Sequence, residues 1–268
     1  MRSRSLLGLL AACLFLSSCA TVPITGRRQL SLIPESQMLS MSLTEYGDFL
    51  KSNKVSGDAQ KTQLVRKVGG RVQGAVERYF AQQGQSDRLA NYKWEFNLVE
   101  SAEVNAWCMP GGKVVVYTGL LPVAKDEAGL AVVMGHEIAH AIAGHGGERM
   151  SQQLAAQLGG TALDAALASK PAQTRQLWSG AFGLGAQYGV LLPFSRQQES
   201  EADRLGLVFM AMAGYDPHTA IEFWGRMSAA AGGQKPPEFL STHPSDATRI
   251  AKLNQLLPEA MGYYQPAR

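Results

Sequence analysis

Residues 126 to 143 constrain the fold of this chain more than any other segment, because they are apolar on nearly every side of a helix. Apolar side chains recur without a polar stripe from Leu130 to Ile142. A helix that is apolar all round is stable only when other elements surround it. Asp126 suits the cap at its start, and Gly144 suits its end. We therefore expect a buried central helix.

The same segment contains the sequence His136-Glu137-Ile138-Ala139-His140. At about 100° per residue the two histidines differ by about 40°, so both imidazoles leave one face and can share a metal ion. Glu137 stands beside that face, where its carboxylate can reach a water molecule without binding the metal. This placement suits a general base. The alternative, two histidines that serve only the core, requires polar partners for both imidazoles.

A catalytic zinc takes three protein ligands, so a third must come from elsewhere in the chain. One zincin class continues the motif as HExxHxxGxxH, but here Ala143 and Gly146 stand where that glycine and third histidine would be. His145 lies about 140° around the helix from His140 and beyond the expected helix end. We expect His145 at the surface.

An acidic cluster on a later helix is the better source of the third ligand. Glu199 and Asp203 are four residues apart and share a face, whereas Glu201 points away from it. A helix that presents Glu199 to the metal would place Asp203 one turn on. There Asp203 can accept a hydrogen bond from the second nitrogen of a ligating histidine. The alternative is a solvated acidic face that pairs with Arg196 and Arg204.

Elsewhere the periodicity predicts helices and one small antiparallel sheet, an α+β chain that is mainly helical. Alternating side chains indicate strands at about 92 to 98 and 113 to 118, and the Pro-Gly-Gly turn at 110 to 112 can connect antiparallel neighbours. The form of residues 149 to 190 stays open. Helices are expected near 35–53 (weakly), 59–82, 196–213 (opened by a capping box of Ser195 and Gln198 and closed by Gly214), 217–230 and 245–257, with a loop at 232–237.

The first 18 residues predict a signal peptide. Arg2 and Arg4 precede an apolar run that is shorter than the roughly 20 residues of a membrane span. Residues 16 to 19, Leu-Ser-Ser-Cys, resemble the bacterial lipobox, which implies that the thiol of Cys19 is acylated and that cleavage makes it the first residue. Residues 19 to 34 are then expected to be an extended tether. The alternative is an ordinary signal peptide with a chance cysteine.

Charge and cysteine content argue against two classes of protein, nucleic-acid-binding proteins and small secreted domains that disulfides stabilise. With 25 basic and 22 acidic residues, the chain lacks the basic surplus of a nucleic-acid-binding protein. Of the three cysteines, Cys13 leaves with the signal peptide and Cys19 is acylated, so Cys108 stands alone. We therefore expect packing and a metal, rather than disulfides, to hold the fold.

Taken together, these motifs resemble the gluzincin family that contains the CAAX prenyl protease, HtpX and the BepA-type periplasmic peptidases. The resemblance covers roughly residues 90 to 255, and an N-terminal segment resembles the lipoprotein members. The motifs are HExxH, Ser-Arg-x-x-Glu-x-Glu-Ala-Asp-Arg at 195–204, Asn105-Ala106 before Pro110-Gly111-Gly112, Thr242-His243-Pro244 with Arg249, and Thr25-Gly26-Arg27-Arg28-Gln29-Leu30.

The resemblance implies a zincin-like metallopeptidase domain over residues 59 to 268, preceded by the signal peptide at 1–18 and by a tether and helix at 19–58. It implies polypeptide substrates and one Zn²⁺ per chain. His136, His140 and Glu199 would bind the zinc, Glu137 would be the base, and Asp203 the carboxylate of the ExxxD motif.

Two further site predictions follow from the resemblance. Residues Asn105 and Ala106 would bind substrate by adding it as a strand. His243 would either donate a hydrogen bond to the oxyanion or occupy the fourth position of the zinc. These alternatives stay open.

The predicted function is hydrolysis of unfolded or misassembled cell-envelope proteins. Ala20, rather than Asp, follows Cys19, so we expect a lipid-anchored protein at the periplasmic face of the outer membrane, without a nucleic-acid partner. The alternatives are a non-catalytic zinc-containing lipoprotein that acts as a chaperone or assembly factor, and a structural lipoprotein without metal. Glu137 argues against the first, because a structural zinc site needs no base beside its ligands.

Overall fold

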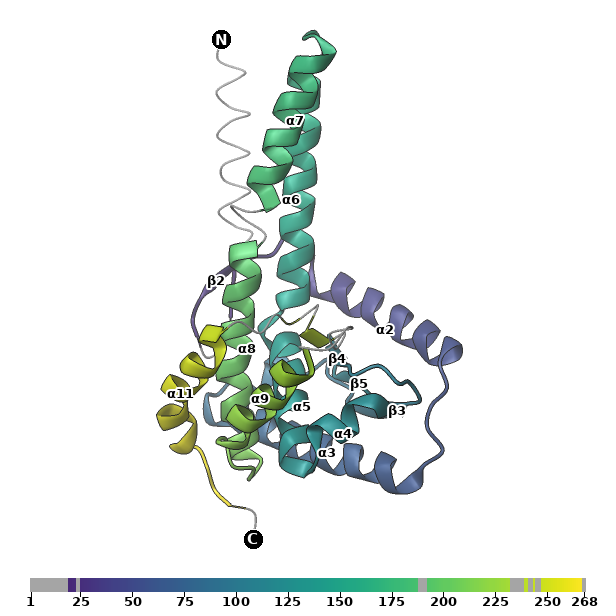
Figure 1. Cartoon of the computed structure of the whole chain (residues 1–268), viewed down its shortest axis with the longest axis vertical. Helices are drawn as coiled ribbons and strands as arrows, with labels where there is room; N and C mark the ends of the chain where they lie inside the picture. The colour runs from purple at the N-terminus through teal and green to yellow at the C-terminus, as the bar shows by residue number, and fades with distance from the viewer. Residues whose placement is uncertain are drawn as a thin grey trace. The chain divides into compact units, whose positions relative to one another are not determined.

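The computed structural model describes residues 19–22, 25–187, 192–231, 239–240, 243 and 247–266 (Figure 1). The expected signal peptide and the loop at 232–237 lie outside these residues. The chain divides into two units. The first unit takes Met1–Met38 and Gly144–Gln197, and the second takes Leu39–Ala143 and Gln198–Arg268.

The first unit contains a strand pair and a helical hairpin. Strand β1 (Cys19–Thr21) pairs antiparallel with β2 (Arg28–Leu30), so the segment expected as a tether is in part an ordered β-hairpin. Residues 149–190, whose form the sequence left open, lie largely in α6 (His145–Ala166) and α7 (Ala172–Ala186). The two helices pack on each other where a Cβ on Gly159 would lie 2.9 Å from the ring of Phe182.

The central helix of the second unit is α5 (Glu127–Ala143), and it is buried along almost its whole length, as expected. The side chain of Asp126 caps its start by accepting a hydrogen bond from the Gly129 amide at 2.9 Å. Gly144, with φ of +71°, ends it in the left-handed conformation that favours glycine. Both ends of this helix could therefore be predicted from the sequence.

A three-stranded sheet lies beside α5 in the order β3 (Glu95–Val99), β5 (Lys113–Tyr117), β4 (Ala106–Met109). The antiparallel pairing expected around the Pro-Gly-Gly turn joins β4 to β5. Strand β3 runs parallel to β5, a pairing that the sequence analysis did not predict. The signal was the unbroken run Val114–Val116, which is wholly buried, as is typical of a central strand.

Helices complete both units. Helix α8 begins at Leu192, so Ser195 lies inside it and the predicted capping box is wrong. It ends before Gly214, whose φ is +85°.

Helix α11 continues through Pro258, and Leu257 and Ala260 are buried in its last turns. The helices not yet given are α2 (Glu35–Ser52), α3 (Ala59–Gln82), α4 (Leu121–Ala124), α8 (Leu192–Met212), α9 (Thr219–Ala231) and α11 (Ala247–Met261), with 3-10 turns at Ser86–Leu89 and Thr118–Leu120.

Among the described residues, no helix combines the length and the apolar character that a membrane span requires.

Candidate metal centre

Two glycines bring the HExxH helix against the helix that carries the acidic cluster. A Cβ on Gly135 of α5 would lie 3.0 Å from the carbonyl oxygen of Gly206, and a Cβ on Gly206 of α8 would lie 3.0 Å from the amide nitrogen of His136. A side chain at either position would push the two backbones apart by a few tenths of an ångström. The backbones of the two helices therefore touch beside His136, and this contact places side chains of α8 within reach of the imidazoles.

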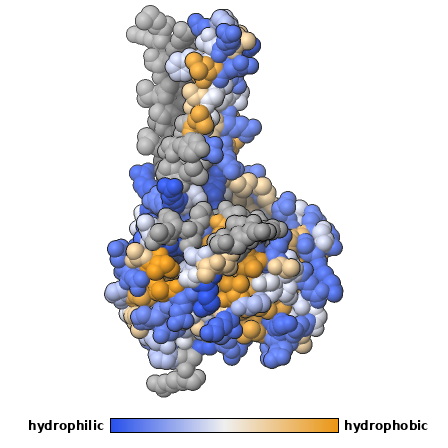
Figure 2. Space-filling view, in the orientation of Figure 1, coloured by the Kyte–Doolittle hydropathy of each residue, from blue (hydrophilic) through white to orange (hydrophobic). Residues whose placement is uncertain are grey.

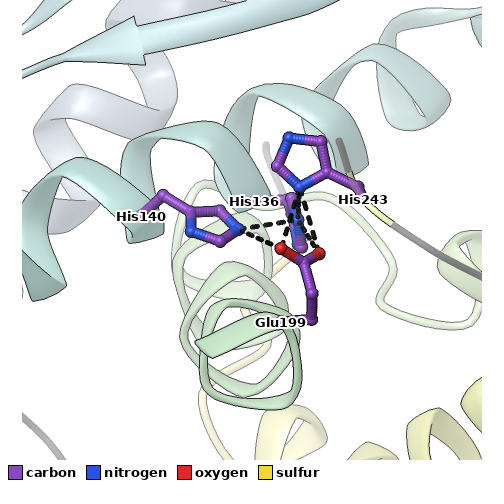
Figure 3. A group of neighbouring side chains, drawn as sticks. All are labelled: His136, His140, Glu199 and His243. Atoms are coloured by element: carbon purple, nitrogen blue, oxygen red, sulfur yellow. Dashed lines mark hydrogen bonds and ion pairs between the residues drawn. The ribbon is translucent and has the colours of Figure 1, made fainter. Parts of the chain in front are cut away.

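Four buried side chains converge in the second unit: His136, His140, Glu199 and His243 (Figure 3). Each offers one ligand atom, and these atoms lie within 4.8 Å of one another. The Nε2 atoms of His136 and His140 are 3.1 Å apart. The Glu199 carboxylate has one oxygen 3.3 Å from each of those nitrogens. The structure thus brings together the two histidines and the glutamate that the sequence proposed as zinc ligands.

The donor set and its spacing fit a zinc ion. Nitrogen and oxygen ligands lie about 2.0–2.2 Å from zinc, so donor atoms at the corners of a tetrahedron are roughly 3.3–3.6 Å apart. The separations of 3.1 to 3.3 Å among His136, His140 and Glu199 are close to that value. The donor atoms are already gathered as such an ion requires.

A second layer of charge supports this cluster. His136 Nδ1 lies 3.0 Å from Asp203 Oδ1, so Asp203 can orient the ring whose other nitrogen faces the site. The guanidinium of Arg249 donates to both oxygens of Asp203, at 2.9 and 2.6 Å, and lies 3.3 Å from the centroid of the Trp224 ring. From the sequence, Arg249 was predictable only as part of a motif, and the role of Trp224 was not predictable.

The electrostatics of the cluster favour positive charge at its centre. Burial lowers the pKa of His136, but Asp203 and Glu199 outweigh it and raise that pKa to about 9. Burial acts to raise the pKa of Glu199, but the three histidines bring it well below its usual range. Arg249 and His136 likewise overcome burial and lower the pKa of Asp203. Such an environment suits a bound cation.

Glu137 lies beside the cluster without joining it. Its Oε1 is 3.4 Å from His243 Nε2, and the residue is 4% exposed. Together with burial, its negative charge raises the pKa of the Cys108 thiol. The carboxylate is therefore close enough to exchange a proton at the site while its oxygens stay outside the ligand set.

His243 is buried, with 6% exposed, rather than free in a loop. Its Nδ1 is 3.0 Å from Glu199 Oε2 and 3.2 Å from His136 Nε2. Its ring stacks on Phe239, with centroids 4.6 Å apart. Thr242 and Pro244, on either side, lie outside the described residues.

The predicted substrate residues lie at the edge of the sheet. Ala106 opens β4 and is buried, and the Asn105 side chain accepts a hydrogen bond from the Ala106 amide at 2.9 Å. Strand β4 pairs with β5 on one side, and no other described strand pairs with its opposite side. Strand β4 is therefore an edge strand of the described sheet.

One expectation about a neighbouring residue is wrong, and the alternative interpretation of the acidic cluster is excluded. His145 is fully buried instead of lying at the surface, and it is the first residue of a new helix, α6, rather than the end of α5. The acidic cluster is not a solvated face, because Glu199, Glu201 and Asp203 are each 6 to 7% exposed. Arg204 instead binds Glu259, with contacts of 2.9 to 3.1 Å.

Comparison with known proteins places residues 67–257 in a match to Peptidase family M48. Mitochondrial metalloendopeptidase OMA1 of Schizosaccharomyces pombe is 36% identical over 247 residues, which are 89% of this chain and 66% of that protein. Human mitochondrial metalloendopeptidase OMA1 is 31% identical over 95% of this chain and 49% of its own. The beta-barrel assembly-enhancing protease of Escherichia coli K12 is 28% identical over 91% of this chain and 49% of its own. This chain thus spans about half to two thirds of the length of these relatives.

Proposed function

Because the chain belongs to peptidase family M48, we propose that it is a zinc-dependent endopeptidase that cleaves unfolded or misassembled proteins of the cell envelope. One observation carries this proposal: a buried carboxylate, Glu137, lies beside a gathered His-His-Glu donor set but outside it. The name of the E. coli relative, an assembly-enhancing protease, supports an envelope substrate, and the OMA1 relatives are named metalloendopeptidases.

The roles of the residues follow from their positions. His136, His140 and Glu199 would hold a zinc ion that acts as a Lewis acid. It would polarise the peptide carbonyl and lower the pKa of water at the site. A carboxylate oxygen of Glu137 accepts the proton of the attacking water and returns it to the leaving amine. Asp203 holds the Nδ1 side of His136 so that its Nε2 faces the site, and Arg249 fixes Asp203.

The free edge of β4 suits unfolded substrates. A polypeptide that adds to this edge as a strand is held by main-chain hydrogen bonds, which do not depend on its side chains. Ala106 begins the edge, next to Asn105, and the strand contacts α5. Recognition through the backbone favours segments that have lost their own pairing, as in a misassembled protein.

The competing function is a zinc-containing chaperone or assembly factor without catalysis. We expect the purified chain to cleave a reduced, unfolded protein, to lose that activity with a chelator, and to regain it when zinc is restored. The products are followed by gel electrophoresis and mass spectrometry, and bound zinc by elemental analysis. One zinc per chain without any cleavage would favour the chaperone and contradict the proposal.

For His243 we propose the second of the two alternatives, a fourth donor that occupies the site until substrate displaces it. Its Nδ1 lies among the other three ligand atoms. We expect His243→Ala to keep zinc and to raise basal turnover, because the fourth zinc position is then open in every molecule. The increase should be about the reciprocal of the fraction of wild-type molecules in which His243 leaves that position open. A fall of roughly 10²- to 10³-fold with zinc retained would identify an oxyanion donor instead. Unchanged turnover and zinc affinity would exclude both roles.

We also propose that Cys19 carries a lipid and anchors the chain at the periplasmic face of the outer membrane. The support is the small-small-Cys sequence after the apolar run, together with Ala20 after the cysteine. A diacylated or triacylated cysteine gives stable anchoring. Acyl labelling of the wild-type chain and of Cys19→Ser tests this proposal, and the same pair of proteins is used in the next experiment.

A further inference from the structure

The helical hairpin of α6 and α7 exposes an unusual share of large apolar side chains. Of the eleven such side chains that are exposed in the described residues, six lie in this hairpin. Figure 2 shows apolar patches along it between polar side chains. The six are Leu154 (38%), Leu158 (59%), Leu177 (72%), Trp178 (55%), Phe182 (37%) and Leu184 (59%).

Four of these side chains, two on each helix, lie away from the contact between α6 and α7. Phe182 marks the side of α7 that faces α6, because its ring lies against Gly159. Leu177 and Leu184 lie about 140° and 160° around α7 from Phe182. On α6, Leu158 lies about 100° around from Gly159, and Leu154 about 140°. Lipid can cover all four of these side chains at once.

Charge is nearly absent from the part of this hairpin that follows Arg149. Between residues 150 and 187 the only charged side chains are Asp164, Lys170 and Arg175, and all three are exposed. Lys170 lies in the turn between the helices, and Arg175 lies in the first turn of α7. Basic residues beside an apolar, tryptophan-containing surface are typical of segments that lie in the lipid interface, where their long side chains reach the phosphates.

The hairpin is tied to the segment that begins at Cys19. Arg27, in the turn between β1 and β2, donates two hydrogen bonds of 2.7 Å to the carboxylate of Glu148 near the start of α6. This ion pair is largely buried, with side chains 13% and 1% exposed. The Leu32 amide donates to the Ser151 hydroxyl at 3.0 Å. One unit therefore contains both the proposed lipid attachment point and the apolar hairpin.

We propose that the hairpin of α6 and α7 inserts its apolar side chains into the interface of a phospholipid bilayer and prefers anionic lipid. It does not span the bilayer, since α7, with 15 residues, is about 22 Å long and the hydrocarbon core is about 30 Å thick. This proposal rests on the proposed acylation of Cys19 only in that acylation would hold the chain at a membrane. The contact with lipid is made by the hairpin alone.

The test uses the full mature chain with Cys19→Ser, so that no acyl chain contributes. Flotation with vesicles of phosphatidylcholine, with and without phosphatidylglycerol, measures binding. We expect binding that strengthens with phosphatidylglycerol and falls roughly ten-fold or more in the double variant Leu158→Asp, Leu177→Asp. The matched control is Met41→Asp, Leu43→Asp, which adds the same two charges at apolar positions of α2 that are 40% and 44% exposed. It should bind as the parent does.

A second variant reports insertion without disturbing binding. Of the four tryptophans, Trp178 is the exposed one, and brominated lipid should quench its fluorescence. Trp178→Phe should keep binding and lose most of that quenching. Equal binding by the hairpin and control variants, or a parent that stays in solution, would overturn the proposal. So would a dimer that only the hairpin variant loses, which would assign the surface to a second copy.

The outcomes separate this proposal from the others. Acylation is scored on the wild-type chain, and cleavage of an unfolded protein is measured for every variant and should not change in solution. A failure of lipidation or of proteolysis therefore leaves the vesicle result standing.

Discussion

Glu137→Gln is expected to lose about 10²- to 10⁴-fold in peptide hydrolysis while it retains one zinc per chain. The amide keeps the size and shape of the carboxylate but cannot accept a proton from water. The zinc stays, because the ligand atoms belong to His136, His140, Glu199 and His243, and Glu137 is not among them. Initial rates on an unfolded protein and elemental analysis of zinc measure the two effects.

The control for this variant is Glu201→Gln, which replaces another buried glutamate of the second unit without touching the ligand set. It should keep both zinc and activity. Full activity in Glu137→Gln would show that another group moves the proton. Loss of zinc in that variant would show that Glu137 is a ligand, and the assignment of roles would then be wrong.

The parts of the site that could be predicted from the sequence are those that helix periodicity determines. Residues four apart share a face in any α-helix, so the pairs His136/His140 and Glu199/Asp203 were readable before the fold was known. The apolar pattern also identified α5 as buried and placed both of its ends. Local rules sufficed because each of these features lies within one helix.

Features that depend on contacts between elements were not predicted. The pairing of β3 with β5 joins strands that are separated by a third, and nothing in either strand alone sets its direction. The burial of His145 depends on a second helix that starts one residue after Gly144. The salt bridge of Arg249 with Asp203 joins α11 to α8. The pattern of apolar and polar residues within one helix or strand does not indicate which other element it will contact.

One contact between elements did leave a signal. Gly135 and Gly206 stand one residue before the first histidine and three residues after Asp203, each in a helix where glycine is unfavourable by about 1 kcal/mol relative to alanine. Two such glycines, one next to a candidate ligand and the other on the same face of its helix as Glu199, indicate that the helices approach backbone to backbone. The structure has that contact. Glycines inside helices next to metal ligands are therefore informative about which helices meet.

The ligand assignment gives the second large effect. Glu199→Gln is expected to lower zinc affinity by more than the 10- to 100-fold that is typical of a residue behind the ligands, because a charged ligand itself is lost. Activity should fall with the zinc. Glu199 has its two oxygens 3.3 Å from His136 Nε2 and His140 Nε2. Glu201 lies about 200° around α8 from Glu199 and faces away.

The comparison of Glu199→Gln with Glu201→Gln is matched in chemistry, helix and burial, since the two glutamates are 7% and 6% exposed. The amide is the better replacement than alanine at both positions, because a cavity in either buried place would destabilise the fold and obscure the metal effect. Zinc affinity is measured by competition with a chelator, and folding by circular dichroism. If Glu201→Gln lost the zinc while Glu199→Gln kept it, α8 would present its other face to the histidines. The contact of Gly206 with His136 argues against that rotation, because it holds the Glu199 and Asp203 face of α8 against the imidazoles.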